Sequence, residues 1–458
     1  MSSEKNQDIF YKISINLLPF FFMGQLIMNI DRSGISYAAL PMRDSIGLTP
    51  EAFGLAAGIF FVGYALIEIP SNLLLEKIGA TRWVSGLIVC WGLTTGCLAF
   101  VTDSTSLILL RFLMGVFEGG YTPAMLYLIT LWVPQARRGR AYSLFLLSVP
   151  LAGLVGGPIS GFLLGIEYGG FEGWQWLFIV EGVVTVCFGV YWAMGVPNAP
   201  QQAKWLTEHQ KTALLEELEL ERRAQNSREH GTSSLLQALK TPPVWIYSLG
   251  LFAMGMGMLG ILMWLPQLIQ HGFPSLTSLE NGILAGVPFA FAMCTLYILG
   301  WTQDKTGDRR WHLATLGLTS GAALLLSLLS PSSVVAYAAL CIAVSCSFTF
   351  AALWWPSPTS VLSATAAAGG LALINGVGNL GGFVGPYVAG LFFEGGEDGF
   401  MRTTAFFGIV MMIAGMWPII FSKLFPSARE LEARKANLEG DTVLEDDVDM
   451  GLQVPGRN

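Results

Sequence analysis

Twelve long apolar stretches constrain this chain more than any other feature. A helix that crosses a bilayer needs about 20 mostly apolar residues. Stretches of roughly this length cover residues 13–36, 52–74, 83–101, 106–132, 140–164, 174–196, 244–269, 281–301, 311–329, 334–356, 366–393 and 400–425. Only 12% of the residues are charged, against about 25% in soluble domains. The sequence therefore predicts an all-α membrane protein with twelve transmembrane helices, since the runs are too long for barrel strands.

Basic residues alternate between the predicted loops. The loops that hold "QARRGR" and "QDKTGDRR" carry several Lys or Arg residues, whereas "VTDSTS" and "IEYGGFEGWQ" carry none. Arg43 and Arg402 are the exceptions. Because Lys and Arg mark the cytoplasmic side, both termini are predicted to be cytoplasmic. The short first outer loop lacks an Asn-x-Ser/Thr acceptor, which favours a bacterial inner membrane.

One polar segment divides the chain into two halves of six spans. We expect an N-terminal bundle at residues 1–196, a cytoplasmic linker at 197–243, a C-terminal bundle at 244–425 and a polar cytoplasmic tail at 426–458. The linker sequence "LTEHQKTALLEELELERRAQ" predicts a surface helix with mixed charge. Paired halves are typical of transporters, whose substrate site lies near the membrane midplane between the repeats.

A short inner loop recurs at equivalent places in the two halves. It reads "NLLLEKIGATRW" between spans 2 and 3 and "GWTQDKTGDRRW" between spans 8 and 9. An ordinary positively charged inner loop would explain one copy, but not readily two. We therefore predict that charge pairs in these loops gate the inner face, through Glu76 and Arg82 in the first copy and Asp304 and Arg309 in the second.

Charged residues inside the spans are few and lie in the first half. A charge at the bilayer centre costs about 2.5–3.5 kcal/mol on insertion scales, so such residues usually face a cavity and serve function. They are Asp31, Arg32, Glu68, Arg111, Glu118 and Glu181. Glu181 is predicted to be structural, and Glu68 is expected either to face the cavity or to pack at a helix end.

Arg111 and Glu118 lie seven residues apart in span 4, which places them on one helix face about 10 Å apart along the axis. They are too far apart to pair directly, so each needs a partner elsewhere or a ligand. Arg32 and Arg111 would offer two guanidinium groups to one cavity, the usual device for binding a carboxylate. Glu118 has no base beside it in its own helix, as expected of a proton carrier. The alternative is a purely structural network of ion pairs.

These patterns resemble the anion:cation symporter family of the major facilitator superfamily, which includes tartrate, phthalate, hydroxyphenylacetate and hexonate permeases. "GIFFVGYALIEIPSNLLLEKIGA" and "RFLMGVFEGGYTPAMLYLITLWVP" are similar to the branch that carries tartrate and aromatic acids. The first inner loop departs from the superfamily pattern, because Asn72 stands where Gly is usual and Glu76 where Asp is usual. Span 7 has no arginine, which argues against vesicular glutamate handling.

The resemblance implies roles for individual residues. Proton coupling falls to Asp31 and Glu118, and carboxylate binding to Arg32 and Arg111. Tyr64 matches a tyrosine that lines the site. The second half is expected to contribute Trp355 and Asn375, although tryptophan packing and helix joining would also explain these two residues.

We therefore expect a proton-coupled symporter that imports a small organic carboxylate by alternating access. The membrane potential opposes anion entry by about 2.3 kcal/mol per charge per 100 mV, so a monoanion needs one proton for neutrality and a second for voltage drive. No enzyme constellation, metal cluster or phosphate loop is visible. The expected partners are the anion, protons and membrane lipid, without nucleic acid or any cofactor beyond the coupling proton, and we expect a monomer. The alternatives are a proton-independent exchanger or facilitator, and a membrane sensor built on a transporter fold.

Overall fold

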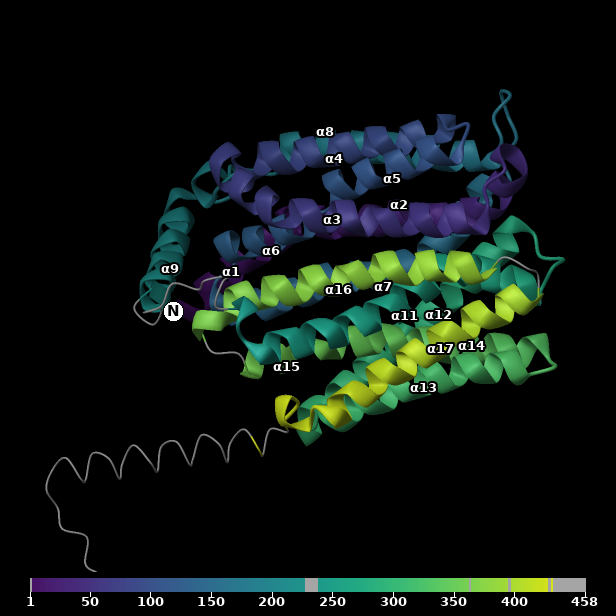
Figure 1. Ribbon diagram of the computed structural model, residues 1–458. Coiled ribbons are helices and arrows are strands. Elements are labelled where there is room, and N and C mark those ends of the chain that lie inside the picture. The colour runs from purple at the N-terminus through teal and green to yellow at the C-terminus, as the bar shows by residue number, and fades with distance from the viewer. Residues whose placement is uncertain (1, 227–237, 362–363, 394–396, 427–429, 431–458) are drawn as a thin grey trace, which may run out of the picture.

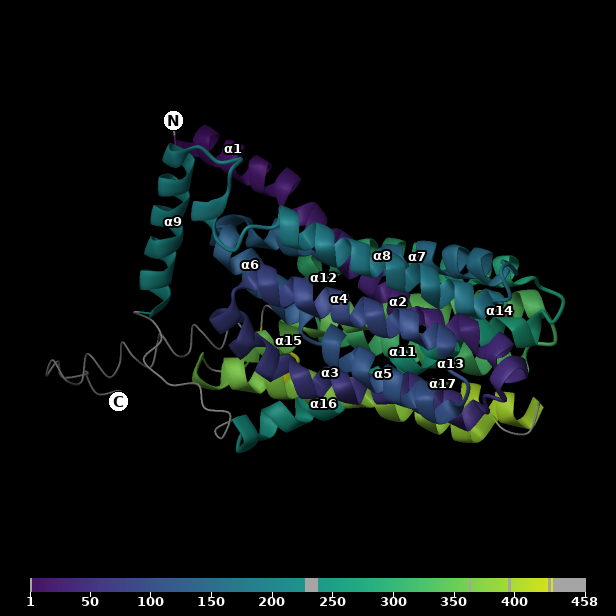
Figure 2. The same cartoon turned by 90° about the horizontal axis from the view of Figure 1, so that it is seen from above.

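A computed structural model describes residues 2–226, 238–361, 364–393, 397–426 and 430. Within these residues, twelve helices are long and apolar enough to cross a membrane, which confirms the number and class of the predicted elements. The helices run side by side in one elongated body (Figures 1 and 2). The side on which the two chain ends lie relative to a membrane stays a prediction.

The first half contains α1 to α8. Their bounds are α1 Ser2–Asn16, α2 Leu18–Ile46, α3 Pro50–Ile78, α4 Ala80–Cys97, α5 Ser104–Glu118, α6 Tyr121–Trp132, α7 Gln135–Leu164 and α8 Gly173–Gly195. The fourth span was expected as one continuous helix. It is instead divided into α5 and α6 at Gly119 and Gly120, so that Glu118 is the last residue of α5. Two consecutive glycines weaken a helix because each loses much backbone freedom on folding.

The second half contains α11 to α17. Their bounds are α11 Pro242–Gly272, α12 Ser278–Thr306, α13 Arg310–Leu329, α14 Ser333–Trp354, α15 Pro356–Val361, α16 Ala364–Phe393 and α17 Glu397–Ile420. The α14 helix ends just before Pro356, as expected from the missing amide hydrogen and fixed φ of proline. The inner loop of this half is followed directly by α13.

The two halves lie on opposite sides of the body, with purple and blue helices above and green and yellow helices below (Figure 1). They meet mainly where α3 packs on α16 and where α7 packs on α12. The close approaches lie near the start of α3 and α12 and near the end of α7 and α16. These segments are at the end of the body opposite the N-terminus and the linker helix, so we call it the closed end.

Glycines permit this contact between the halves. A Cβ atom at Gly286 of α12 would lie 2.6 Å from the carbonyl oxygen of Leu154 of α7, and one at Gly58 of α3 would lie 2.5 Å from the carbonyl oxygen of Phe383 of α16. Small residues at helix interfaces let two backbones approach closely in a membrane. The sequence "GLVGGPISG" of span 5 therefore acts in packing between halves as well as within them.

The predicted surface helix of the linker is present as α9, Glu208–Asn226. It docks on the first half, where Glu221 accepts hydrogen bonds from the backbone of Gln135 at 2.8 Å and from Arg138 at 3.1 Å. Linker residues 227–237 and tail residues 427–429 and 431–458 lie outside the described residues. The predicted domain boundaries therefore stay a prediction.

Candidate functional site

Close packing of α3 against α5 builds the centre of the first half. Gly115 of α5 and Gly119, which directly follows α5, face the carbonyl groups of Phe60 and Tyr64 of α3, where an added Cβ would collide with the backbone. The two helices can therefore approach more closely than larger side chains would allow. This contact sets the aromatic residues of α3 beside the two charged residues of α5.

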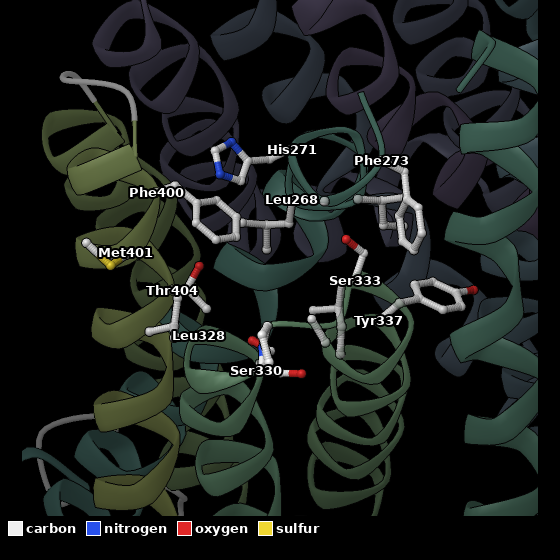
Figure 3. A pocket seen from close by; sticks show the side chains of 16 residues that line it. Leu268, His271, Phe273, Leu328, Ser330, Ser333, Tyr337, Phe400, Met401 and Thr404 are labelled. Carbon is white, nitrogen blue, oxygen red and sulfur yellow. The ribbon is translucent and has the colours of Figure 1, made fainter. Parts of the chain in front are cut away.

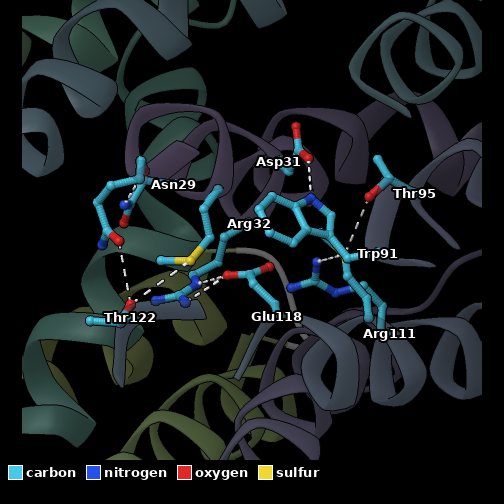
Figure 4. Close-up of polar contacts among 11 residues, drawn as sticks. Asn29, Asp31, Arg32, Trp91, Thr95, Arg111, Glu118 and Thr122 are labelled. Carbon is cyan, nitrogen blue, oxygen red and sulfur yellow. Dashed lines mark hydrogen bonds and ion pairs between the residues drawn. The ribbon is translucent and has the colours of Figure 1, made fainter. Parts of the chain in front are cut away.

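Arg32 and Glu118 form a salt bridge between α2 and α5 (Figure 4). The Nε and Nη2 groups of Arg32 donate hydrogen bonds of 2.8 and 2.6 Å to the same Oε1 atom of Glu118. The Arg32 side chain is 17% exposed, whereas the Glu118 side chain is completely buried. The sequence showed no base beside Glu118 in its own helix, and the structure supplies one from the first span.

Three aromatic rings surround the guanidinium group of Arg32. Its central carbon lies 5.0 Å from the ring centre of Phe60, 5.9 Å from that of Phe61 and 5.1 Å from that of Tyr64. A cation over an aromatic face is attracted by the ring quadrupole. Tyr64, which the sequence predicted to line the site, thus lies beside Arg32. Phe60 and Phe61 were not predicted from the sequence, although Phe60 precedes Tyr64 by one helical turn.

Arg111 lies deeper than Arg32. Its side chain is fully buried, and its guanidinium carbon lies 4.9 Å from the ring centre of Phe60, so that both arginines share this ring. Its Nε donates to the carbonyl oxygen of Ala56 at 3.3 Å, and Nη1 contacts the sulfur of Met114 at 3.3 Å. The Nη2 group has no hydrogen-bond partner among the described residues. The structure thus places the two arginines together but exposes only Arg32.

Asp31 points away from Arg32, as expected for adjacent residues about 100° apart on a helix. It is 2% exposed. One of its oxygens, Oδ2, accepts hydrogen bonds of 2.7 Å from Nε1 of Trp91 in α4 and from Oγ1 of Thr185 in α8. Neither donor was predicted, because sequence alone does not show which helices surround α2.

The predicted residues of the second half lie apart from one another. The side-chain amide of Asn375 in α16 donates a hydrogen bond to Oε1 of Glu68 in α3, which links the two halves. This places Glu68, whose role was open, at the contact between halves. Trp355 instead packs on an apolar cluster that includes Tyr247 and Trp354.

The predicted gating residues lie at helix ends rather than in long loops. Glu76 is near the end of α3, Arg82 is in the first turn of α4, Asp304 is near the end of α12 and Arg309 directly precedes α13. Arg309 donates a hydrogen bond of 3.0 Å to the carbonyl oxygen of Pro356. Arg82 and Asp304 are exposed. The side chain of Glu76 lies outside the described residues. The proposed charge pairing across these loops stays a prediction.

A cavity of about 360 Å³ lies at the closed end, within the second half (Figure 3). Residues of α11, α13, α14 and α17 line it, and the His271 ring stacks on Phe400 with ring centres 3.9 Å apart. It contains no residue predicted for the site. Within the described part of the chain, no three His, Cys, Asp or Glu side chains gather in a group that could hold a metal ion.

Comparison with known proteins places the chain in a family. The family model described as "Major Facilitator Superfamily" matches residues 21–386. A protein named "Quinolone resistance transporter" from Acinetobacter baumannii is 36% identical over 421 residues, which cover 91% of this chain and 96% of that protein. A "Putative tartrate transporter" from Agrobacterium vitis is 35% identical over 425 residues, which cover 91% of this chain and 94% of the relative.

A solved structure shows the same fold. The crystal structure of a bacterial homolog of the human lysosomal transporter Spinster, inward-facing and unoccupied, matches with a TM-score of 0.73 at 17% identity. The match covers 92% of this chain and 98% of that chain. The relatives are transporters rather than enzymes, and the superfamily predicted from the sequence is confirmed. This chain belongs to the Major Facilitator Superfamily and is a multi-pass membrane transporter.

Proposed function

We propose that this transporter imports a small organic anion together with protons, by alternating access. The salt bridge between Arg32 and Glu118 carries this proposal, because it joins the partly exposed cation of the site to a fully buried acid. The similarity to a relative named as a putative tartrate transporter supports a carboxylate as the substrate.

Substrate and Glu118 would compete for one guanidinium group. A substrate carboxylate needs the same Nε and Nη2 donors of Arg32 that Glu118 now occupies. Protonation of Glu118 removes its charge and weakens this salt bridge, which frees Arg32 for the anion. Proton binding and anion binding then favour each other, and linkage makes this effect reciprocal. Co-transport follows if only the fully loaded and the empty carrier change conformation.

The other predicted residues receive supporting roles. Tyr64 stands beside Arg32 and would contact the bound anion. Arg111 is fully buried, so we propose that it reaches the substrate only in another conformation. Asp31 would provide a second proton site on the far side of α2. Asn375 and Trp355 would contribute from the second half, and Asn375 would first have to leave Glu68.

The conformation fits an inward-facing transporter in a bacterial inner membrane. If the basic loops are cytoplasmic, the closed end is the outer one. Opening at the inner end would then separate the gating pairs that involve Glu76, Arg82, Asp304 and Arg309. Asp304→Asn would accordingly shift the equilibrium further toward this state.

Transport assays in proteoliposomes test the proposal. Tartrate uptake should rise with an inward pH gradient and with an inside-negative potential, and an internal pH dye should report protons that enter with tartrate. Tartrate uptake that neither gradient changes would indicate a facilitator. Uptake that occurs only when tartrate is already present inside the vesicles would indicate an exchanger. Binding without flux would indicate a sensor.

A second candidate is extrusion of an aromatic drug, which the relative named as a quinolone resistance transporter favours. The rings of Phe60, Phe61 and Tyr64 around Arg32 would suit an aromatic compound. Vesicles that carry the opposite pH gradient distinguish the two. A lower outer pH drives accumulation inside the vesicles by proton symport, whereas by proton exchange it drives the compound out. Accumulation through an exchanger therefore requires the lower pH inside.

A further inference from the structure

Glu181 of α8 is a buried acid that the proposed mechanism does not use. It is 5% exposed, and neither of its carboxylate oxygens has a hydrogen-bond partner among the described residues. A buried charge without a partner is strongly disfavoured, so such a group normally takes its neutral form. The other buried acids of this region differ, because Asp31 accepts two hydrogen bonds and Glu118 pairs with Arg32.

Glu181 lies directly against α2, one turn from Asp31. A Cβ atom built on Gly34 would lie 2.6 Å from Oε2 of Glu181, and Gly34 follows Asp31 by three residues. On α8, Thr185 follows Glu181 by four residues and donates to Asp31. The carboxyl groups of Asp31 and Glu181 therefore lie on facing turns of two packed helices, and they interact electrostatically.

The ionisable groups around Glu181 come from a few of the helices that pack against it. Asp31 and Tyr37 act on it from α2, and Arg111 acts on it from α5. The α4 helix faces the adjacent Gly182 with Gly92 and Gly96. The α7 helix has no ionisable side chain between residues 143 and 164. Arg111 is therefore the basic group that can match a charge on Glu181.

The contacts of Glu181 favour its neutral form in this conformation. Arg32 pairs with Glu118, and Arg111 makes no hydrogen bond to a carboxylate, so an ionised Glu181 would be a buried charge without a contacting cation. The balance changes once Glu118 is protonated, because one arginine then lacks a partner. The Nη2 group of Arg111 makes no hydrogen bond to any described residue, and Arg111 interacts electrostatically with Glu181.

We propose that Glu181 is a proton-carrying residue of the transport cycle, neutral in this conformation and ionised in another, where its carboxylate pairs with Arg111. In the releasing step the carboxyl O–H bond breaks, the proton passes to water, and the negative charge remains on Glu181 beside the guanidinium group. This inference rests on the proposed proton coupling, but the protonation of Glu181 can be measured without transport.

Difference infrared spectroscopy of the purified protein provides that measurement. At neutral pH, wild-type protein should show the carbonyl band of a buried carboxylic acid. The wild-type spectrum minus that of Glu181→Gln should show a lost carbonyl component, which Glu118→Gln and the exposed control Glu167→Gln should retain. A wild-type spectrum without the band, or a difference spectrum in which Glu181→Gln loses no carbonyl intensity, overturns the proposal whatever the transport assays show.

Proteoliposomes then test the role in coupling, with tartrate as the probe. Wild-type uptake without proton entry would reject the proposed function and leave the infrared result standing. If wild type couples, Glu181→Gln should exchange labelled for unlabelled tartrate but accumulate it only to passive equilibrium. Accumulation at the wild-type level by Glu181→Gln overturns the inference alone, because a structural neutral acid tolerates this substitution.

Glu181→Asp controls for folding. It keeps a titratable group at a slightly different depth, so it should still accumulate tartrate, but the pH dependence of accumulation should shift. If Glu181→Gln fails to fold, the pH dependence of accumulation by Glu181→Asp tests the proposal instead. A profile identical to that of wild type overturns the proposal. Loss of exchange and binding in a folded Glu181→Gln protein also overturns it, since that result would indicate a positioning role.

Discussion

The guanidinium group of Arg32 donates two hydrogen bonds to a single carboxylate oxygen of Glu118, across the interface between α2 and α5. The arginine is partly exposed and the glutamate is completely buried. A substrate carboxylate that reaches Arg32 would have to replace Glu118. This relationship makes the salt bridge the first target for experiments.

Arg32→Lys should weaken substrate binding. Lysine keeps the charge but cannot present two donors in a fixed plane. Loss of one charged hydrogen bond costs about 1.5–3 kcal/mol, so the dissociation constant should rise roughly tenfold or more. Calorimetric titration with tartrate measures it, and Arg43→Lys at the exposed end of the same helix is the matched control. Equal binding by both variants would move the site away from Arg32.

Glu118→Gln should separate exchange from accumulation. The amide imitates the protonated acid, so tartrate should still bind and exchange, but the cycle can no longer release a proton at this position. Accumulation driven by a pH gradient or a membrane potential should be lost. Both assays use the same vesicles, with Glu51→Gln at the exposed start of α3 as the control. Accumulation like that of wild type would leave Asp31 or Glu181 as the carrier.

Trp91→Phe should destabilise the protein through Asp31. The indole Nε1 donates one of the two hydrogen bonds to the buried Asp31 carboxylate. Its loss leaves a buried polar group short of one partner, which should cost about 1–3 kcal/mol. The melting temperature in detergent measures the change. Trp301→Phe, on the exposed face of α12, is the control and should leave the melting temperature unchanged.

Gly286→Val should open the closed end. A side chain at this position meets the carbonyl oxygen of Leu154, which belongs to the other half of the protein. The halves must separate there, so cysteines placed on both sides of the interface should react faster with a soluble thiol reagent. Gly86→Val serves as the control, because no atom lies within 4 Å of its added Cβ. Unchanged reactivity would show that the contact does not hold the closed end together.

Asp103 should make stability depend on acid pH. It caps α5 by accepting hydrogen bonds from the backbone amides of Thr105 at 2.8 Å and Ser106 at 3.0 Å. These bonds, led by that from Ser106, lower the pKa of Asp103 in the folded protein. The stabilisation is therefore complete above the unfolded pKa of about 3.9 and is lost as the pH falls through the lower folded value.

Asp103→Ala should accordingly melt at a lower temperature than wild type at pH 7, and the difference should shrink at strongly acid pH. Asp103→Asn retains a cap without the charge, so its melting temperature relative to Asp103→Ala should change less with pH. A constant difference between wild type and Asp103→Ala at every pH would contradict the assignment.

The sequence by itself determined the number of spans, the surface helix of the linker and the residues worth testing, because these depend on composition and on spacing along one helix. The site residues Asp31, Arg32, Arg111 and Glu118 stood out as charges in apolar runs. Even the divergence of Asp31 and Arg32 followed from helical geometry.

Only the tertiary structure decided which partner each charge has. Glu118 meets Arg32 from another helix, Asp31 meets Trp91 and Thr185, and the acid expected to be structural, Glu181, makes no hydrogen bond to the described residues. The break of span 4 after Glu118 was also unforeseen. These features depend on which helices are neighbours and how far each is rotated. Close backbone contacts at glycines set both properties, and a single sequence does not encode them as a local pattern.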